Sequence, residues 1–180
     1  TSFLPNPLMP PIAKLTAESA AAAFMLGESI QTSAGDPSRA GEAIRVVGTN
    51  PFIIGSKGAE GTRFLELIRS NDIECFVINT GHLGDEGKDI GVDDTVAILW
   101  GVTRGEITWK DDDFLNLTIP DEVPNLDISE FYPPDYVDDY PSQLAELQED
   151  RQSFLAQFDD LEREIIESAL VTPVEQTQLE

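Results

Sequence analysis

The chain has 180 residues, and 41% of them are hydrophobic, which is enough for one domain with a substantial core. It carries 34 acidic residues against 11 basic ones, so its formal net charge at pH 7 is −23. This charge argues against sequence-independent binding to nucleic acid and against binding to anionic membranes, because both need a basic surface.

Three interpretations of the acidic excess compete. It is a halophile surface that keeps the folded chain dispersed in concentrated salt, an interaction tail, or a site for divalent cations. The acids are scattered over predicted helices and loops, which favours the halophile surface. The run at 111–113 (DDD) has no EF-hand spacing, so we interpret it as a solvated loop and expect no metal ligand in this chain.

The cysteine content and the hydropathy of the sequence indicate in which cellular compartment the protein works. Cys75 is the single cysteine, so the chain forms no internal disulfide, and its apolar surroundings predict an inert core position. No apolar run approaches a membrane span, and no signal peptide is visible. We therefore expect a cytoplasmic protein.

The first predicted helix covers residues 17–26. Thr16 is its expected N-cap and Gly27 its end. Residues 32–42 are rich in Gly, Ser, Pro and Asp and predict a loop, and residues 44–47 predict a short strand.

A second helix is predicted at 61–70. Its expected inward-facing side chains are Phe64, Leu65, Leu67 and Ile68.

The central stretch, residues 74–100, predicts a strand, a glycine loop and a helix. The apolar run at 74–79 suits a strand that is covered on both faces. Four glycines follow in 80–91, Asp93 and Asp94 precede the predicted helix, and Gly101 is expected to close it. A glycine loop before a helix is where α/β proteins often bind ligands; a plain surface turn is the alternative.

Gly87 and Lys88 look like the end of a phosphate-binding P-loop. The full pattern needs a glycine five positions before Gly87, where this chain has His82. It also needs Ser or Thr after the lysine, where this chain has Asp89. We therefore reject a P-loop here, and we interpret His82 as a loop residue with no catalytic role.

The last third predicts one more strand and one long helix. Leu115, Leu117 and Ile119 alternate with polar residues, which predicts a half-buried strand at 114–120. Residues 142–170 show a helical apolar stripe with acids on the other face, which predicts a long helix packed on the domain.

Six segments of the chain follow one another in an order that matches a known family, at nearly matching spacings. They are residues 8–16, 24–27 with 34–35, 77–81, 84–95, 104–107 and 114–127. In that order they are similar to the segments LPPISKLT, FLSG…AG, LVNTGW, G…GKRISIKDT, NGSL and FNLAIPTELPGVD. The chain therefore resembles the C-terminal part of ATP-dependent phosphoenolpyruvate carboxykinase, to which these segments belong.

The resemblance implies an α/β fold. Residues 1–141 would form part of the mixed-sheet, mononucleotide-binding C-terminal domain of a carboxykinase, and residues 142–180 a long C-terminal helix with an acidic tail. The family reaction converts oxaloacetate and ATP to phosphoenolpyruvate, CO2 and ADP in gluconeogenesis, with Mg²⁺ and usually a second divalent ion such as Mn²⁺. The acidic composition suggests a haloarchaeal version.

The resemblance also implies site residues. The family's adenine-binding positions fall on Asp89, Ile90 and Thr95. Ile90 and Thr95 match, but the family has Arg where this chain has Asp89; a guanidinium can stack on adenine and a carboxylate cannot. Either Lys88 substitutes for that arginine, or the contact with adenine is weaker in this chain.

Residues 32–45 correspond to the family's active-site lid, which closes over the substrate and excludes water. Arg39 and Arg45 are the basic residues there that would meet phosphate or carboxylate.

The family's P-loop, its metal-binding Lys, His and Asp, and its oxaloacetate-binding Arg lie upstream of the matching region. We therefore expect no catalytic residue and no metal ligand in this chain, no activity from it alone, and the N-terminal part of the same enzyme as its partner. The alternative is a non-catalytic, acidic nucleotide-binding or interaction module that kept the fold without the P-loop.

Overall fold

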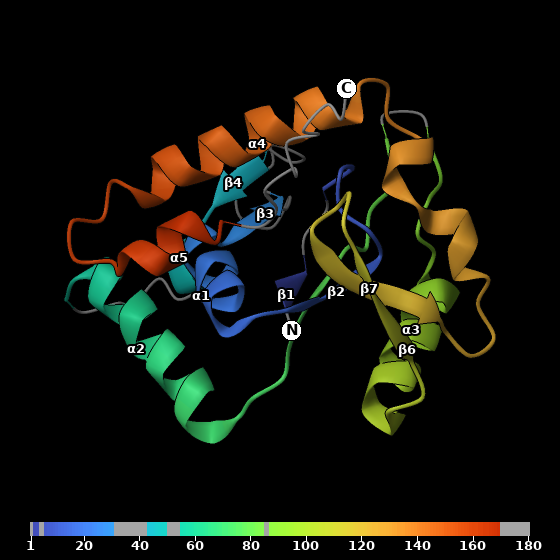
Figure 1. Cartoon of the computed structure of the whole chain (residues 1–180), viewed down its shortest axis with the longest axis horizontal. Helices are drawn as coiled ribbons and strands as arrows, with labels where there is room; N and C mark the ends of the chain where they lie inside the picture. Colours follow the sequence, from blue (N-terminus) through green and yellow to red (C-terminus); the bar gives the residue numbers. More distant parts are fainter. Residues whose placement is uncertain (1, 4–5, 31–42, 50–54, 85–86, 170–180) are drawn as a thin grey trace, which may run out of the picture.

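The computed structural model describes residues 2–3, 6–30, 43–49, 55–84 and 87–169. Helices cover both faces of a mixed sheet, which confirms the predicted α/β class (Figure 1).

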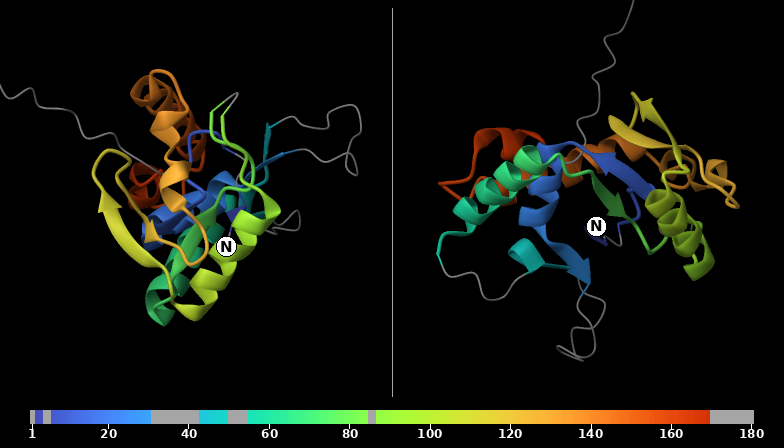
Figure 2. Two further views of the ribbon diagram at one scale, coloured as in Figure 1. Left: turned by 90° about the vertical axis from the view of Figure 1, so that its right-hand side faces the viewer. Right: turned by 90° about the horizontal axis from the view of Figure 1, so that it is seen from below.

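The sheet has five strands in the order β1-β5-β2-β7-β6. β1 runs parallel to β5, and every other neighbouring pair is antiparallel. A separate antiparallel pair, β3 and β4, projects from the body of the molecule (Figure 2). The strands are β1 (Ser2–Phe3), β2 (Ile12–Leu15), β3 (Glu28–Ile30), β4 (Ala43–Arg45), β5 (Cys75–Ile78), β6 (Thr108–Asp112) and β7 (Leu117–Glu122).

Helices α1, α2, α4 and α5 lie on one side of the sheet and α3 on the other (Figure 1). The α-helices are α1 (Ala17–Leu26), α2 (Lys57–Asn71), α3 (Val92–Arg104), α4 (Tyr140–Leu155) and α5 (Arg163–Glu167). Short 3-10 turns are η2 (Val47–Thr49), η3 (Ile128–Phe131) and η4 (Pro133–Asp135).

Successive side chains of β2 and β5 point to opposite faces of the sheet, so the core has two layers, one on each face. Ala13 and Val77 are buried in a cluster with α1, α4 and α5. Their neighbours Ile12 and Ile78 point to the opposite face and pack against Ile98 of α3. The central strands are thus covered on both faces, as their apolar sequences predict.

Helix α1 has the predicted bounds and caps. The Thr16 hydroxyl accepts a hydrogen bond from the Ser19 backbone N–H at 3.1 Å. Gly27 adopts the left-handed conformation (φ +50°), and its N–H donates to the Ala23 carbonyl. A side chain at Gly27 would also overlap the Val46 carbonyl. Glycine is therefore required both by the left-handed backbone and by this close contact.

Helix α2 is longer than predicted, and one of its inward assignments is wrong. Leu65 and Ile68 are buried as expected, but Leu67 is 49% exposed. The apolar pattern of a helix does not specify which of its apolar residues the neighbouring elements cover, and among the described residues none covers the Leu67 side of α2.

Helix α3 begins earlier and ends later than predicted. Asp94 lies in its first turn and accepts a hydrogen bond from the Gly91 N–H at 2.8 Å. Gly101 does not close the helix; it is buried inside it, where a side chain would collide with Ile107. The end is at Gly105, whose φ of +67° is left-handed.

The single long helix predicted at 142–170 is wrong. Helix α4 ends at Leu155, a turn follows, and α5 covers only five residues. The turn is stabilised by hydrogen bonds from the Phe158 N–H to the Leu155 carbonyl and from the Leu161 N–H to the Phe158 carbonyl. It brings Leu161 and Ile165 back into the core beside α1, which a straight helix could not do. The predicted tail at 170–180 lies outside the described residues.

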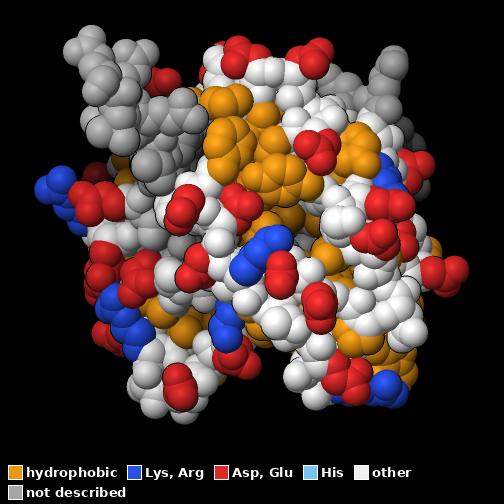
Figure 3. All heavy atoms as spheres, turned by 45° about the vertical axis from the view of Figure 1, so that its right-hand side comes forward, with side chains coloured by type: hydrophobic (Ala, Val, Ile, Leu, Met, Phe, Trp, Pro, Cys, Tyr) orange, Lys and Arg blue, Asp and Glu red, His pale blue; other side chains and the backbone are white. Residues whose placement is uncertain are grey.

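On the face that Figure 3 shows, acidic side chains are scattered rather than gathered in one patch. The solvated loop expected at 111–113 is wrong for its first two residues, because Asp111 and Asp112 end β6. Asp111 accepts a hydrogen bond from the Thr118 hydroxyl at 2.7 Å, and Asp112 accepts one from the Leu115 N–H at 2.8 Å. Among the described residues, no helix is both long and apolar enough to cross a membrane.

Candidate functional site

The candidate site is the loop between β5 and α3, which the structure describes except at 85–86. The loop folds back on itself. The Leu83 N–H donates to the Lys88 carbonyl, and the Ile90 N–H donates to the Gly81 carbonyl, both at 2.9 Å. Hydrogen bonds between residues of the loop itself therefore stabilise its conformation, in addition to any contact with neighbouring segments.

Asn79 fixes the start of the loop. Its side chain is 1% exposed and donates to the backbone carbonyls of Asn6 and Met9, both at 2.8 Å. Its amide oxygen accepts a hydrogen bond from the Gly81 N–H at 3.0 Å. One buried side chain thus joins the end of β5 to the segment that leads into β2.

Gly84 lets the loop approach two other segments closely. Its N–H donates to the Pro7 carbonyl at 3.1 Å, and its φ is +64°. A Cβ at this position would overlap the Tyr136 backbone oxygen. The loop is therefore packed between residues 6–11 on one side and the η4 segment on the other.

Lys88 faces the η3 segment. Its ammonium group forms an ion pair with Glu130 and lies 4.3 Å from the centroid of the Phe131 ring. The hydrogen bond that Lys88 donates to the Glu130 carboxylate raises the pKa of Lys88, so the side chain stays protonated.

The other predicted residues lie together at the junction of loop and helix, but they differ in accessibility. Ile90 is 6% exposed and packs in a small cluster with Leu83 and Phe131. The Thr95 hydroxyl is half-buried and donates to the Gly91 carbonyl at 3.0 Å, while Asp89 is exposed. The chemical character of the accessible surface is therefore set by Asp89 and by the first turn of α3.

Arg45, one of the two predicted lid residues, is engaged with α4. Its guanidinium lies 2.5 Å from the Asp150 carboxylate, 3.3 Å from the Glu28 carboxylate and 4.8 Å from the centroid of the Phe154 ring. The structure does not bring it next to Lys88 through any described contact. Arg39 lies outside the described residues.

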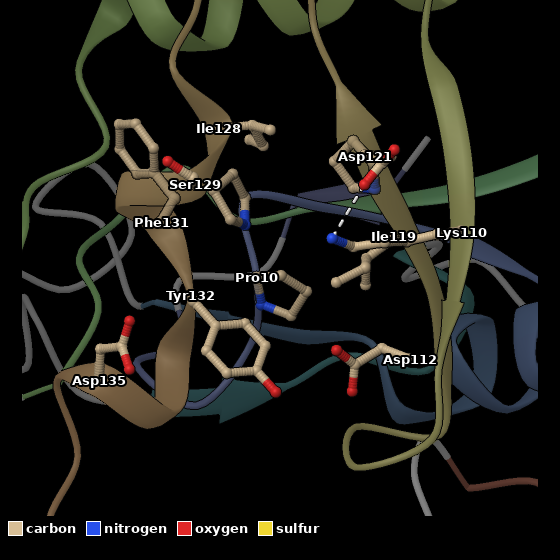
Figure 4. Close-up of a pocket in the computed structure, with 12 residues that line it drawn as sticks. Pro10, Lys110, Asp112, Ile119, Asp121, Ile128, Ser129, Phe131, Tyr132 and Asp135 are labelled. Atoms are coloured by element: carbon tan, nitrogen blue, oxygen red, sulfur yellow. Dashed lines mark ion pairs between the residues drawn. The ribbon is translucent and has the colours of Figure 1, made fainter.

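A second concave feature is a pocket of about 320 Å³ between the β6–β7 hairpin and the η3–η4 segment (Figure 4). Lys110 of β6 and Asp121 of β7 form an ion pair at 3.0 Å on the hairpin wall of the pocket. The Tyr132 hydroxyl points toward Asp112, and burial together with that carboxylate raises the pKa of Tyr132. None of the predicted nucleotide residues lines this pocket, which shares Ile128 and Phe131 with the apolar cluster below the glycine loop.

Within the part of the chain that the structure describes, no group of three or more His, Cys, Asp or Glu side chains is placed to hold a metal ion. His82 is exposed, and its backbone forms a β-bridge with Asp89.

Sequence analysis missed three residues that support the loop: Glu130, Phe131 and Tyr136. They belong to an aromatic and proline-rich run, FYPPDY at 131–136, together with the residue before it. The prolines of this run are typical of irregular chain, but its three aromatic residues indicate that it packs against another segment.

Comparisons with known proteins agree on one family. The sequence model of the family described as phosphoenolpyruvate carboxykinase matches residues 6–129. A phosphoenolpyruvate carboxykinase (ATP) from Aeropyrum pernix is 34% identical over 154 residues, which cover 83% of this chain and 30% of that protein. Proteins of the same description from Nitrobacter hamburgensis and Rhodopseudomonas palustris are 25% and 27% identical over 129 and 128 residues. This chain spans about a quarter to a third of the length of these relatives.

Proposed function

The chain belongs to the phosphoenolpyruvate carboxykinase family, and from this membership we propose that it is the C-terminal part of an ATP-dependent enzyme of that family. The assembled enzyme would be a lyase that converts oxaloacetate and ATP to phosphoenolpyruvate, CO2 and ADP in gluconeogenesis. The partner of this chain would be the N-terminal part of the same enzyme.

The role assigned to this chain is the adenine side of the ATP cleft. The observation that carries this assignment is the hydrogen-bonded junction of loop and helix, where Asp89 is exposed just before α3 and Thr95 is half-buried near the start of the helix. The loop is fixed by Asn79 and by the Gly81 hydrogen bond, so these positions are held ready for a ligand. Ile90 would shape this surface from below rather than contact the adenine face directly, because its side chain is buried.

The lid is assigned to residues 32–45, with Arg39 and Arg45 as its basic residues. In the arrangement described here Arg45 is already paired with Asp150 and Glu28, so contact with substrate would require it to leave α4. We assign Mg²⁺ and Mn²⁺ to the remainder of the enzyme, where they would neutralise charge on the transferred phosphoryl group. The described residues of this chain supply the nucleotide surface instead.

We also propose the division into a nucleotide-binding part at 1–141 and a C-terminal addition at 142–180. Leu144, Leu155 and Ile165 of the addition are buried in the same core as α1. The addition would therefore stabilise the nucleotide-binding part rather than act as an independent unit.

The direct test combines this chain with the remaining polypeptide of its parent enzyme in molar KCl and measures ATP-dependent decarboxylation of oxaloacetate. We expect activity from the mixture and none from either piece alone. A well-folded mixture that binds neither nucleotide nor oxaloacetate and produces no phosphoenolpyruvate would overturn the assignment.

A non-catalytic nucleotide-binding or interaction module is the second candidate. The exposed Asp89 carboxylate favours it, because this negative charge stands where the family has an arginine. The module would be compact and soluble by itself in molar KCl and would bind ATP weakly or not at all, whereas the enzyme part would bind ATP tightly in the assembled protein. Calorimetry with ATP on the chain combined with the remaining polypeptide separates the two candidates, and an isolated chain that unfolds or aggregates would count against the module.

We likewise propose a haloarchaeal origin, which the net charge of −23 supports, and a cytoplasmic location, which the single cysteine supports. Salt screens repulsion between exposed carboxylates. The melting temperature should therefore rise steadily between about 0.1 and 2 M KCl; a fall over this range would contradict a halophile surface.

A further inference from the structure

His82 and Asp89 lie opposite each other in the loop between β5 and α3. They form an antiparallel β-bridge, and a backbone hydrogen bond of 2.9 Å flanks the bridge on each side. We call the paired segments, residues 81–83 and 88–90, the loop ladder. In a pair of this kind the Cα atoms are about 4.5 Å apart and both side chains leave the same face. The imidazole and the carboxylate are therefore direct neighbours.

The two faces of the loop ladder have different surroundings. Leu83 and Ile90, next to the bridged residues, are 0% and 6% exposed and pack in one cluster with Phe131 on the inner face. His82 and Asp89 are exposed. Because successive side chains of a β-ladder point to opposite faces, both of these side chains lie on the outer face, just before α3.

Lys88 is engaged on the inner face of the loop ladder, since it is one position away from Asp89. Its ammonium forms an ion pair with Glu130 and lies 4.3 Å from the centroid of the Phe131 ring. It is thus directed away from the face that carries Asp89, the position where the family has arginine. Among the residues of the loop ladder, His82 is the aromatic side chain that lies beside this position.

The charges on the outer face favour the base of a nucleotide over its phosphates. Asp89 is exposed there, and Asp93 and Asp94 follow in the first turn of α3. These carboxylates would repel phosphate oxygens, whereas an adenine ring is uncharged. Nucleotide bases stack on the faces of aromatic side chains, including histidine, and such stacking needs no complementary charge.

Hydrogen bonds fix the backbone on both sides of His82. The Gly81 N–H donates to the buried Asn79 side chain at 3.0 Å, and the Gly84 N–H donates to the Pro7 carbonyl at 3.1 Å. A short side chain on such a backbone loses little conformational freedom when it stacks on a ligand. The imidazole is therefore presented to solvent from an ordered support.

We propose that the His82 imidazole stacks on the adenine ring of ATP, in place of the arginine that the family has at position 89. The inference rests on the proposed function, namely that the junction of loop and helix forms the adenine side of the cleft. The stacking group then comes from the opposite segment of the loop ladder. The sequence alone placed no partner beside His82, because Asp89 is its neighbour only across the ladder.

The experiment measures ATP affinity by calorimetry on this chain combined with the remaining polypeptide of the parent enzyme, in molar KCl. We expect His82→Ala to weaken ATP binding by about 5-fold or more, the effect of losing one stacked aromatic side chain. His82→Phe keeps an aromatic ring and should stay within about 3-fold of the unmodified protein. Arg104→Ala is the matched control, because it removes an exposed cationic side chain at the opposite end of α3; it should not alter affinity.

Inorganic tripolyphosphate distinguishes a contact with the base from a disturbance of the fold, because it carries phosphates without a base. Its affinity should be the same in His82→Ala and in the unmodified assembled protein. Equal losses of tripolyphosphate and ATP binding, or an unchanged ATP affinity in His82→Ala, would overturn the inference. So would a His82→Phe variant that binds ATP as weakly as His82→Ala, because the aromatic ring would then not be the binding group.

Nuclear magnetic resonance gives a second readout that needs no substitution. His82 is the only histidine of this chain, so isotope-labelled histidine in this chain alone reports on its ring in the assembled protein. ATP should move the ring-proton resonances to higher field, as expected for protons above the face of a purine, and tripolyphosphate should not. An unchanged His82 spectrum in protein saturated with ATP would contradict the contact.

The decarboxylation assay separates this inference from the proposed function. If the unmodified assembled protein binds ATP and produces phosphoenolpyruvate while His82→Ala binds ATP equally well, the proposed function stands and the assignment of His82 falls. If the unmodified mixture neither binds ATP nor produces phosphoenolpyruvate, both fall together.

Discussion

Arg151 of α4 binds Glu28 of β3 through two parallel hydrogen bonds. The distances are 2.9 Å from Nε to Oε1 and 2.6 Å from Nη2 to Oε2. The Arg151 side chain is fully buried and Glu28 is 15% exposed, so the pair is shielded from solvent. It ties the base of the β3–β4 pair to the C-terminal helix across 123 residues of sequence.

Removal of the Glu28 charge should destabilise the fold strongly. In Glu28→Gln the buried Arg151 guanidinium loses the charged group that accepts both of these hydrogen bonds, and loss of one partner of a buried ion pair typically costs about 3–5 kcal/mol in the free energy of unfolding. Urea denaturation in molar KCl measures this. Glu167→Gln is the matched control, because Glu167 pairs with Arg163 on the surface; it should leave stability nearly unchanged. Similar stability of both variants would contradict the role of the buried pair.

The same pair predicts how stability depends on pH. Burial alone would raise the pKa of Glu28, but the guanidinium groups of Arg151 and Arg45 outweigh burial, and the net shift is downward. A lowered pKa in the folded state means that the stabilisation is present above the unfolded-state pKa of about 4.3 and is lost as the pH falls through the lower folded value. The free energy of unfolding of the wild type should therefore decrease below about pH 4.3, with a smaller decrease in Glu28→Gln. Equal pH profiles of the two proteins would exclude this linkage.

Asn79 should be required for the order of the glycine loop. Asn79→Ala removes two donated hydrogen bonds and one accepted one, and leaves the carbonyls of Asn6 and Met9 without this donor. We expect a loss of about 2–4 kcal/mol in unfolding free energy and faster hydrogen exchange at residues 81–90. Asn71→Ala is the control at an exposed helix end, where we expect a change within about 0.5 kcal/mol. Unchanged exchange in the loop would show that Asn79 does not hold it.

Gly84→Ala tests the close approach of the loop to the η4 segment. The substitution places a Cβ in a left-handed conformation and against the Tyr136 carbonyl oxygen. The two effects together should cost about 2–5 kcal/mol. Gly105→Ala isolates the first effect, because Gly105 has a φ of +67° with open space around it; we expect about 1–2 kcal/mol there. If the two alanine variants lose the same stability, the contact with Tyr136 carries no energy.

Asp89→Arg restores the residue type that the family has at this position. If the junction of loop and helix forms the adenine side of the cleft, a guanidinium there can stack on the base. ATP affinity of the assembled enzyme should then increase by about 2- to 30-fold, the range of one cation–π contact. Asp113→Arg is the control, with the same charge change on the β6–β7 turn, and it should not alter affinity. Equal effects of both substitutions would indicate nonspecific attraction of ATP by added positive charge.

Local sequence determined much of this protein. Thr16 and Gly27 define α1 because capping groups act on backbone atoms within one turn. The strand–loop–helix order around residues 74–100 follows from apolar runs and glycines that lie next to one another in the chain. The family was also accessible from sequence, because its matching segments retain their order.

The tertiary structure alone decided the features that depend on contacts between distant segments. Leu67 is half exposed because no described element covers that side of α2, and the apolar pattern of the helix carries no information about this. The helix that begins at Tyr140 ends at Leu155 because Leu161 and Ile165 gain burial beside α1 only if the chain turns. Arg45, expected to face substrate, is held by Asp150, more than 100 residues away in sequence, since an ion pair depends on proximity in space and not along the chain.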